Sequence, residues 1–116
     1  MDDISVLLVE DQMLIAMNAE MMLSEYGLTN VVTVSSAAEA LNKLKTYTPM
    51  AAVLDVNLGA GTSIPIAQEL RRQGVPFIFA TGYGDGSIIP EEFSDIGVLR
   101  KPYSGKDLMP AILNLL

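Results

Sequence analysis

Residues 6–11 read Val-Leu-Leu-Val-Glu-Asp, a run of four apolar residues that ends in two carboxylates. We predict a strand over Val6 to Val9 because turn or capping residues bound this apolar run. Four further runs of the same kind predict strands over Val31 to Val34, Ala51 to Leu54, Phe77 to Ala80 and Val98 to Arg100. Near-continuous apolarity is typical of strands that are buried on both faces, as in a parallel sheet.

Longer amphipathic stretches separate these runs and predict helices. The first helix places Ile15, Ala19, Met22 and Tyr26 on one face and stops at Gly27. Capping signals open the other long helices: a Ser36 and Glu39 capping box, Ser63 before Pro65 with an end near Gly74, and Ser104 with Asp107. A shorter helix is predicted from Ile88 to Asp95. The alternation of strands and helices predicts an α/β fold, with helices on both faces of a parallel sheet.

The composition limits the classes of function. A chain of 116 residues, half of them apolar, predicts a single domain over 1–116 with one hydrophobic core. The absence of cysteine and histidine excludes thiolate zinc sites and Ser-His or Cys-His nucleophile pairs, so carboxylates remain for chemistry. A net charge of −7 disfavours direct nucleic-acid binding. No apolar run is long enough to span a membrane and no secretory signal is visible, so we expect a cytoplasmic protein.

Polar residues follow four of the five predicted strands. Glu10 and Asp11 follow the first strand, Asp55 the third, Thr81 the fourth and Lys101 the fifth. In an open parallel sheet the functional crevice lies at the carboxyl ends of the strands. If these four strands are neighbours, three carboxylates, a hydroxyl and an ammonium group converge on one pocket.

Each of these residues has an ordinary structural interpretation when it is taken alone. Glu10 and Asp11 suit a helix N-terminus, and Asp55 suits an Asx turn. Thr81 can be a loop hydroxyl, and Lys101 can be a solvated charge at the end of a strand. The joint placement of all five at the predicted switch point favours a functional site.

Three converging carboxylates repel one another unless a cation neutralises them. Mg2+ suits such a cluster because it takes few protein carboxylates, keeps water and bridges to phosphate oxygens. A carboxylate beside Mg2+ can attack a phosphoryl donor, while a nearby ammonium group offsets charge on the phosphoryl oxygens. We therefore predict Asp55 as the nucleophile and Lys101 as the charge-offsetting group.

These motifs together resemble the receiver domain of two-component response regulators over essentially the whole chain. The resemblance is carried by the 6–11 run, by Asp55-Val56-Asn57, by Thr81 and by Lys101-Pro102. It implies a flavodoxin-like, doubly wound sheet of five parallel strands in the order 2-1-3-4-5. It also implies the following roles: Glu10 and Asp11 as the acidic pair of a Mg2+ site, Asp55 as phosphoacceptor and metal ligand, Asn57 as a ligand through its backbone carbonyl, Thr81 as a switch hydroxyl, Lys101 as the phosphoryl-contacting lysine, and a cis bond before Pro102.

The stretch from Pro76 to Tyr83 further resembles the subgroup with a Phe-Ala-Thr-Gly-Tyr-like motif. Other receivers carry a Phe or Tyr in the last strand that reports phosphorylation by rotating, and Val98 stands at that position here. We therefore expect the switch to involve Thr81, Gly82, Val98 and Pro102, with the signal leaving through the loop from Gly82 to Pro90 and the helix after it.

The resemblance implies a phosphoacceptor signalling domain that is phosphorylated by a histidine kinase or histidine phosphotransfer protein and then acts on an unknown protein partner. Such a domain catalyses its own phosphorylation and slow dephosphorylation and is not a turnover enzyme. A small Asp-dependent phosphatase is one alternative, since Asp55-Val56-Asn57 is similar to its Asp-x-Asp motif, although that motif belongs after the first strand. A flavin carrier or an inert binding module is another, although the phosphate-binding loop that a flavin needs after the first strand is missing.

Overall fold

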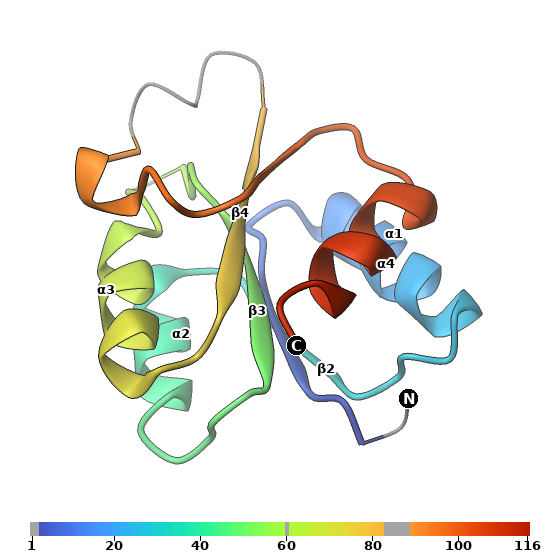
Figure 1. Ribbon diagram of the computed structural model, residues 1–116, viewed down its shortest axis with the longest axis horizontal. Helices are drawn as coiled ribbons and strands as arrows, with labels where there is room; N and C mark the ends of the chain where they lie inside the picture. The colour runs from blue at the N-terminus through green and yellow to red at the C-terminus, as the bar shows by residue number, and fades with distance from the viewer. Residues whose placement is uncertain (1–2, 60, 83–88) are drawn as a thin grey trace.

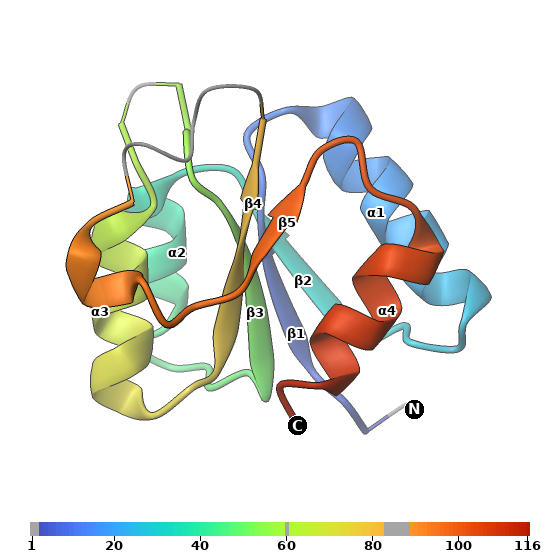
Figure 2. The same cartoon turned by 45° about the horizontal axis from the view of Figure 1, so that its top comes forward.

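The computed structural model describes residues 3–59, 61–82 and 89–116. Five parallel strands form one sheet in the order β2-β1-β3-β4-β5 (Figures 1 and 2). The strands are β1 (Val6–Val9), β2 (Val31–Val34), β3 (Ala51–Asp55), β4 (Phe77–Thr81) and β5 (Val98–Arg100). The predicted fold and strand order are confirmed. β3 and β4 each extend one residue further than predicted, so Asp55 and Thr81 are the last residues of their strands.

Two helices cover each face of the sheet. α2 (Ala37–Lys43) and α3 (Ile64–Gln73) lie on one face, while α1 (Met13–Glu25) and α4 (Gly105–Leu113) lie on the other (Figure 1). α1 and α3 end at Gly27 and Gly74, whose positive φ angles of 87° and 75° are easily adopted by glycine. Among the described residues, no helix is long and apolar enough to cross a membrane.

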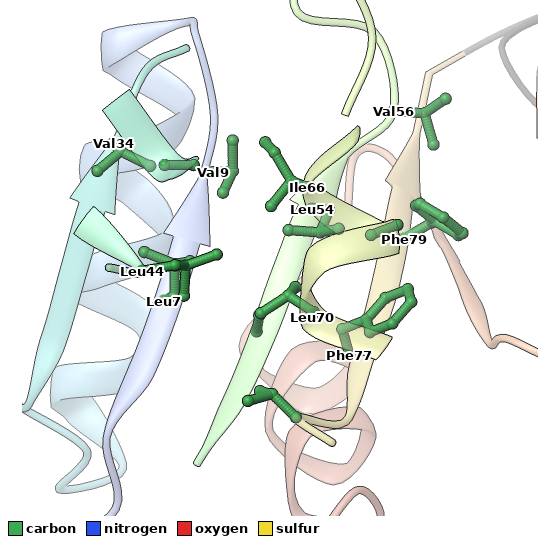
Figure 3. Packing of buried hydrophobic residues seen from close by; sticks show 14 of the residues in the cluster. Leu7, Val9, Val34, Leu44, Leu54, Val56, Ile66, Leu70, Phe77 and Phe79 are labelled. Atoms are coloured by element: carbon green, nitrogen blue, oxygen red, sulfur yellow. The ribbon is translucent and has the colours of Figure 1, made fainter. Parts of the chain in front are cut away.

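Alternate residues of each strand enter two separate hydrophobic clusters. Leu7 and Val9 of β1 belong to the same cluster as Ile66 and Leu70 of α3 (Figure 3), whereas Val6 and Leu8 belong to the second cluster. This alternation follows from the two-residue repeat of a strand. Each fully buried large apolar side chain contributes about 1.5–3 kcal/mol, so the central strands are held firmly where their carboxyl ends form the site.

The helical face of α1 that the apolar spacing marks is buried only in part. Its buried residues are Ala16, Ala19 and Leu23, whereas Tyr26 is 45% exposed. α1 carries large apolar residues on its solvent side as well: Met13, Leu14, Met17 and Met21. Apolar spacing therefore could not identify the inward face, which is lined instead by two small alanines that allow close packing on the sheet.

The helix caps that the sequence predicts at Ser36 and Ser63 form only in part. Ser36 Oγ accepts a hydrogen bond from the backbone N–H of Glu39 at 3.1 Å, but the Glu39 carboxylate accepts from Ser35 and not from Ser36. Ser63 stands at the N-cap of α3, yet within the described chain its buried hydroxyl has no hydrogen-bond partner. Its ψ of 4° departs from the extended backbone that usually aims a capping side chain.

The helix predicted from Ile88 to Asp95 was wrong in its described part, and Ile88 lies outside the described residues. Only a single 3-10 turn, η2 (Glu91–Phe93), forms there. Phe93 is buried in edge-to-face contact with Phe77 and Phe79, with ring centroids 5.9 Å away in each case. Arg71 of α3 lies 4.7 Å above the Phe93 ring and donates a 2.7 Å hydrogen bond to the Glu92 carbonyl. Side chains thus hold this segment without a regular helix.

Candidate functional site

The carboxyl ends of β1, β3, β4 and β5 bring all the polar residues predicted for the site to one edge of the sheet. Glu10, Asp55 and Thr81 are each at most 4% exposed, whereas Asp11 is exposed. The backbone ladder sets this arrangement, because the Lys101 N–H donates to the Thr81 carbonyl at 2.8 Å. The convergence predicted from strand order is therefore present in the fold.

Lys101 joins two of the carboxylates. Its Nζ lies 2.6 Å from Glu10 Oε1 and 3.1 Å from Asp55 Oδ2. The second oxygen of Glu10, Oε2, accepts a 3.1 Å hydrogen bond from the backbone N–H of Gln12. The Lys101 ammonium group thus lies between two buried carboxylates, and when both carboxylates are ionised these three groups have a net negative charge even before Asp11 is counted.

One oxygen from each of Glu10, Asp11 and Asp55 lies within 4.8 Å of the others. A cavity of about 210 Å3 opens beside this cluster. Its lining residues are Asp11, Gln12, Ile15, Asp55, Asn57, Gly59, Gly82 and Lys101. Clustered carboxylate oxygens beside an open cavity are a donor set for a hard divalent cation that retains water.

The pKa of Asp55 is raised from its ordinary value of 3.8 to about 7, chiefly by burial and then by the hydrogen bond and charge of the adjacent Glu10, while Lys101 partly opposes these effects. For Lys101, burial disfavours the ammonium form, but contacts with Glu10 and Asp55 outweigh this and raise its pKa. Burial also raises the pKa of Tyr103, with a smaller contribution from the charge of Glu10. A second cation would favour the ionised form of Asp55.

Two residues in the loop after β3, Asn57 and Gly59, line the cavity. The Asn57 side-chain oxygen accepts a 3.0 Å hydrogen bond from the Gly59 N–H, and Asn57 forms an isolated antiparallel bridge with Thr62. Gly59 has a φ of 78° and lines the cavity, as does Gln12. Sequence reasoning missed Gly59 and Gln12, although an Asn two residues before a glycine is a recognisable turn signal.

The residues expected to act in switching lie at different depths. Gly82 lines the cavity, and the Lys101–Pro102 peptide bond is cis. Val98 is 52% exposed on the edge strand β5. The loop expected to carry the signal falls largely outside the described residues, because residues 83–88 are not among them.

Known proteins are similar to this chain in sequence and in structure. The family model described as "Response regulator receiver domain" matches residues 6–113. The acid tolerance regulatory protein ActR from Sinorhizobium medicae is 30% identical over 82 residues, a match that covers 67% of this chain and 42% of that protein. This chain thus spans less than half the length of that relative.

Two solution structures of SdrG are similar to this chain. SdrG from Sphingomonas melonis Fr1 has a TM-score of 0.83 and 39% identity, covering 97% of this chain and 95% of that one. The BeF3-activated conformation of SdrG from Pseudomonas melonis Fr1 has a TM-score of 0.77 and 40% identity, covering 92% and 91%. With the family match over residues 6–113, these findings show that the chain belongs to the response regulator receiver domains of two-component systems.

Proposed function

We propose that this receiver domain accepts a phosphoryl group on Asp55 and acts as a conformational switch for a protein partner. The observation that carries the proposal is the placement of Asp55, which is buried at the end of β3, in contact with Lys101 and beside an open cavity. The donor would be a histidine kinase or a histidine phosphotransfer protein, the class of phosphodonor that the receiver family implies. Receiver domains are signalling domains and not turnover enzymes.

Receiver domains bind a divalent metal in an acidic pocket, and we propose Mg2+ as the ion for this chain. Glu10, Asp11 and Asp55 would hold it, together with the backbone carbonyl of Asn57. The oxygens of the three carboxylates fit a hard cation, because they lie within 4.8 Å of one another and two of the three residues are buried. When bound, Mg2+ would neutralise the carboxylates and the phosphoryl oxygens.

The chain's own residues supply the remaining chemistry. A carboxylate oxygen of Asp55 attacks the phosphorus atom as the bond to the donor's imidazole nitrogen breaks, and the bonding electrons leave with that nitrogen. Lys101, which contacts Asp55 at 3.1 Å, offsets negative charge on the phosphoryl oxygens. Thr81 ends the neighbouring strand β4 and would supply a hydroxyl that responds to the new group.

The SdrG relative supports this proposal, since one of its structures is described as a BeF3-activated conformation and beryllofluoride mimics a phosphoryl group. That chain is 40% identical to this one. This similarity supports the proposal that a phosphoryl group activates this chain as well.

Incubation with acetyl phosphate and Mg2+, followed by intact mass measurement, tests the proposal. We expect a mass increase equal to one phosphoryl group, with no increase in the Asp55→Asn variant or when a chelator replaces Mg2+. Asp107→Asn is a control, because this acid lies in the first turn of α4 and is not among the cavity-lining residues. Full labelling of Asp55→Asn would overturn the assignment of the acceptor, and turnover of free phosphomonoesters would favour a phosphatase.

A further inference from the structure

Gly59 lies so close to the proposed metal site that a side chain in its place would crowd the Asp11 carboxylate. A Cβ atom built on Gly59 would lie 3.2 Å from Asp11 Oδ2, which is tighter than ordinary van der Waals contact. The Gly59 backbone is held in this position by a φ of 78° and by the hydrogen bond from its N–H to Asn57 Oδ1. The loop therefore brings bare backbone against the Asp11 carboxylate.

Asp11 is the member of the acidic cluster with the fewest restraints. Glu10 is fixed by Lys101 and by the Gln12 N–H, and Asp55 is fixed by Lys101. The carboxylate of Asp11 is exposed, and the described residues make no hydrogen bond or ion pair with it. Its freedom to turn toward a cation therefore depends on the space that neighbouring groups leave.

We propose that Gly59 is a positioning residue for the metal site, because its missing side chain leaves room for the Asp11 carboxylate and for the water that Mg2+ retains. This inference rests on the proposed function of the acidic cluster. Mg2+ demands oxygen ligands at about 2.0–2.1 Å in near-octahedral geometry and dehydrates reluctantly. A methyl group at position 59 would displace the Asp11 oxygen by a few tenths of an ångström, a large error for such a site.

The expected loss of affinity is comparable with that of other groups that orient metal ligands. Replacing outer partners of ligands typically weakens metal binding by about 10- to 100-fold. We expect Gly59→Ala to weaken Mg2+ binding by about 10-fold. Binding of Ca2+ should weaken less, because that ion accepts more variable geometry and longer bonds of about 2.3–2.6 Å.

Two other glycines separate this effect from backbone strain. Gly27 has a comparable φ of 87° but nothing within 4 Å of its would-be Cβ, so Gly27→Ala introduces strain without a contact. Gly61 lies in the same loop as Gly59, has no positive φ, and also has nothing within 4 Å. Gly61→Ala should therefore leave metal binding unchanged and should not lower stability.

The experiment measures the melting temperature without metal and then titrates Mg2+ and Ca2+ by two-dimensional NMR of the full chain. Gly59→Ala and Gly27→Ala should each lower the melting temperature by about 3–6 °C, because alanine disfavours positive φ. Only Gly59→Ala should weaken Mg2+ binding. If it unfolds, Gly59→Asn serves instead, since Asn adopts positive φ more readily but still places a Cβ against Asp11.

The possible outcomes distinguish a failure of the inference about Gly59 from a failure of the proposed metal site. Unchanged Mg2+ affinity in Gly59→Ala and Gly59→Asn, with normal binding by the parent chain, would overturn the inference and leave the proposed function intact. Equal weakening in Gly27→Ala would also overturn it, because strain alone would then explain the loss. Failure of the parent chain to bind Mg2+ would overturn the proposed metal site together with the inference.

Discussion

Asp55→Asn is expected to stabilise the metal-free protein at alkaline pH. Asp55 is 4% exposed and lies beside Glu10, and its pKa in the folded state is raised to about 7. In the unfolded chain the carboxyl group returns to its ordinary pKa of 3.8. Between these two values the folded protein binds a proton that the unfolded chain lacks, so protonation of Asp55 favours folding.

The direction of the pH effect follows from this raised pKa. The stability associated with the protonated carboxyl is fully present below about pH 4, declines as the pH rises toward 7, and is absent above it. A pKa difference of about 3, at 1.36 kcal/mol for each pKa unit, corresponds to a loss of at most about 4 kcal/mol in the free energy of unfolding as the pH rises. Because the site is open to water through its cavity, we expect the loss to be about 2–4 kcal/mol.

Urea unfolding in the presence of a chelator, followed by far-ultraviolet circular dichroism, measures this effect. At about pH 8, Asp55→Asn should be more stable than the parent chain by about 2–4 kcal/mol, whereas at about pH 4 the two should nearly coincide, because asparagine resembles a protonated aspartate. Glu25→Gln is the matched control, since Glu25 is an exposed acid in the last turn of α1. It should show only a small difference between the two pH values.

Mg2+ supplies a second arm of the same experiment. A ligand that binds only the folded state stabilises it, so Mg2+ should stabilise the parent chain more than Asp55→Asn and reduce the variant's advantage. The electrostatic reasoning would be refuted if Asp55→Asn were equally or less stable at alkaline pH. It would also be refuted if the gain were the same at both pH values.

Three further predictions concern the metal, the lysine and the route of the signal. Asp11→Ala should abolish Mg2+ binding in an NMR titration, since too few anionic ligands remain; an unchanged titration would contradict this. Lys101→Met should retain Mg2+ binding but lose the conformational response to beryllofluoride, because the ammonium contacts the phosphoryl group; a normal response would refute that role. The variant should also be less stable, because Glu10 loses its buried partner. Beryllofluoride should increase hydrogen-exchange protection within residues 82–95, and Val98→Ala should leave that change largely intact; identical exchange in both states would exclude this route.

The sheet could be predicted from the sequence because its strands are short, nearly continuous apolar runs. The convergence of the candidate site residues could also be predicted once the strand order was given, since residues after neighbouring parallel strands meet at one edge of the sheet. The inward face of α1 could not be predicted, because Met13 and Met17 are as apolar as the residues that the helix buries. Nor could the single turn at Glu91–Phe93, because its form depends on Arg71, a residue 22 positions before Phe93 that contacts its ring.

Details of the site depended on contacts between residues that are distant in the chain. Lys101 and Glu10 are 91 positions apart, so their 2.6 Å contact is set by the pairing of strands and not by a local motif. The approach of Gly59 to Asp11 likewise requires the loop after β3 to fold over the end of β1. Residue types and strand order predict which groups meet, whereas loop conformation determines how closely they meet.

The charge arrangement explains how one small site can couple metal, phosphoryl group and conformation. With Glu10 and Asp55 both buried and joined through one ammonium group, the ionised cluster has more negative than positive charge. A divalent cation would offset that negative charge, which favours an ionised and therefore nucleophilic Asp55. In the proposed function, phosphoryl transfer to Asp55 would then add negative charge at the same place and would give Lys101 a new partner in competition with Glu10. A change in the contacts of Lys101 reaches the backbone that pairs with Thr81, because the Lys101 N–H donates to the Thr81 carbonyl. The ends of β4 and β5 are therefore the elements through which we expect phosphorylation to be felt first.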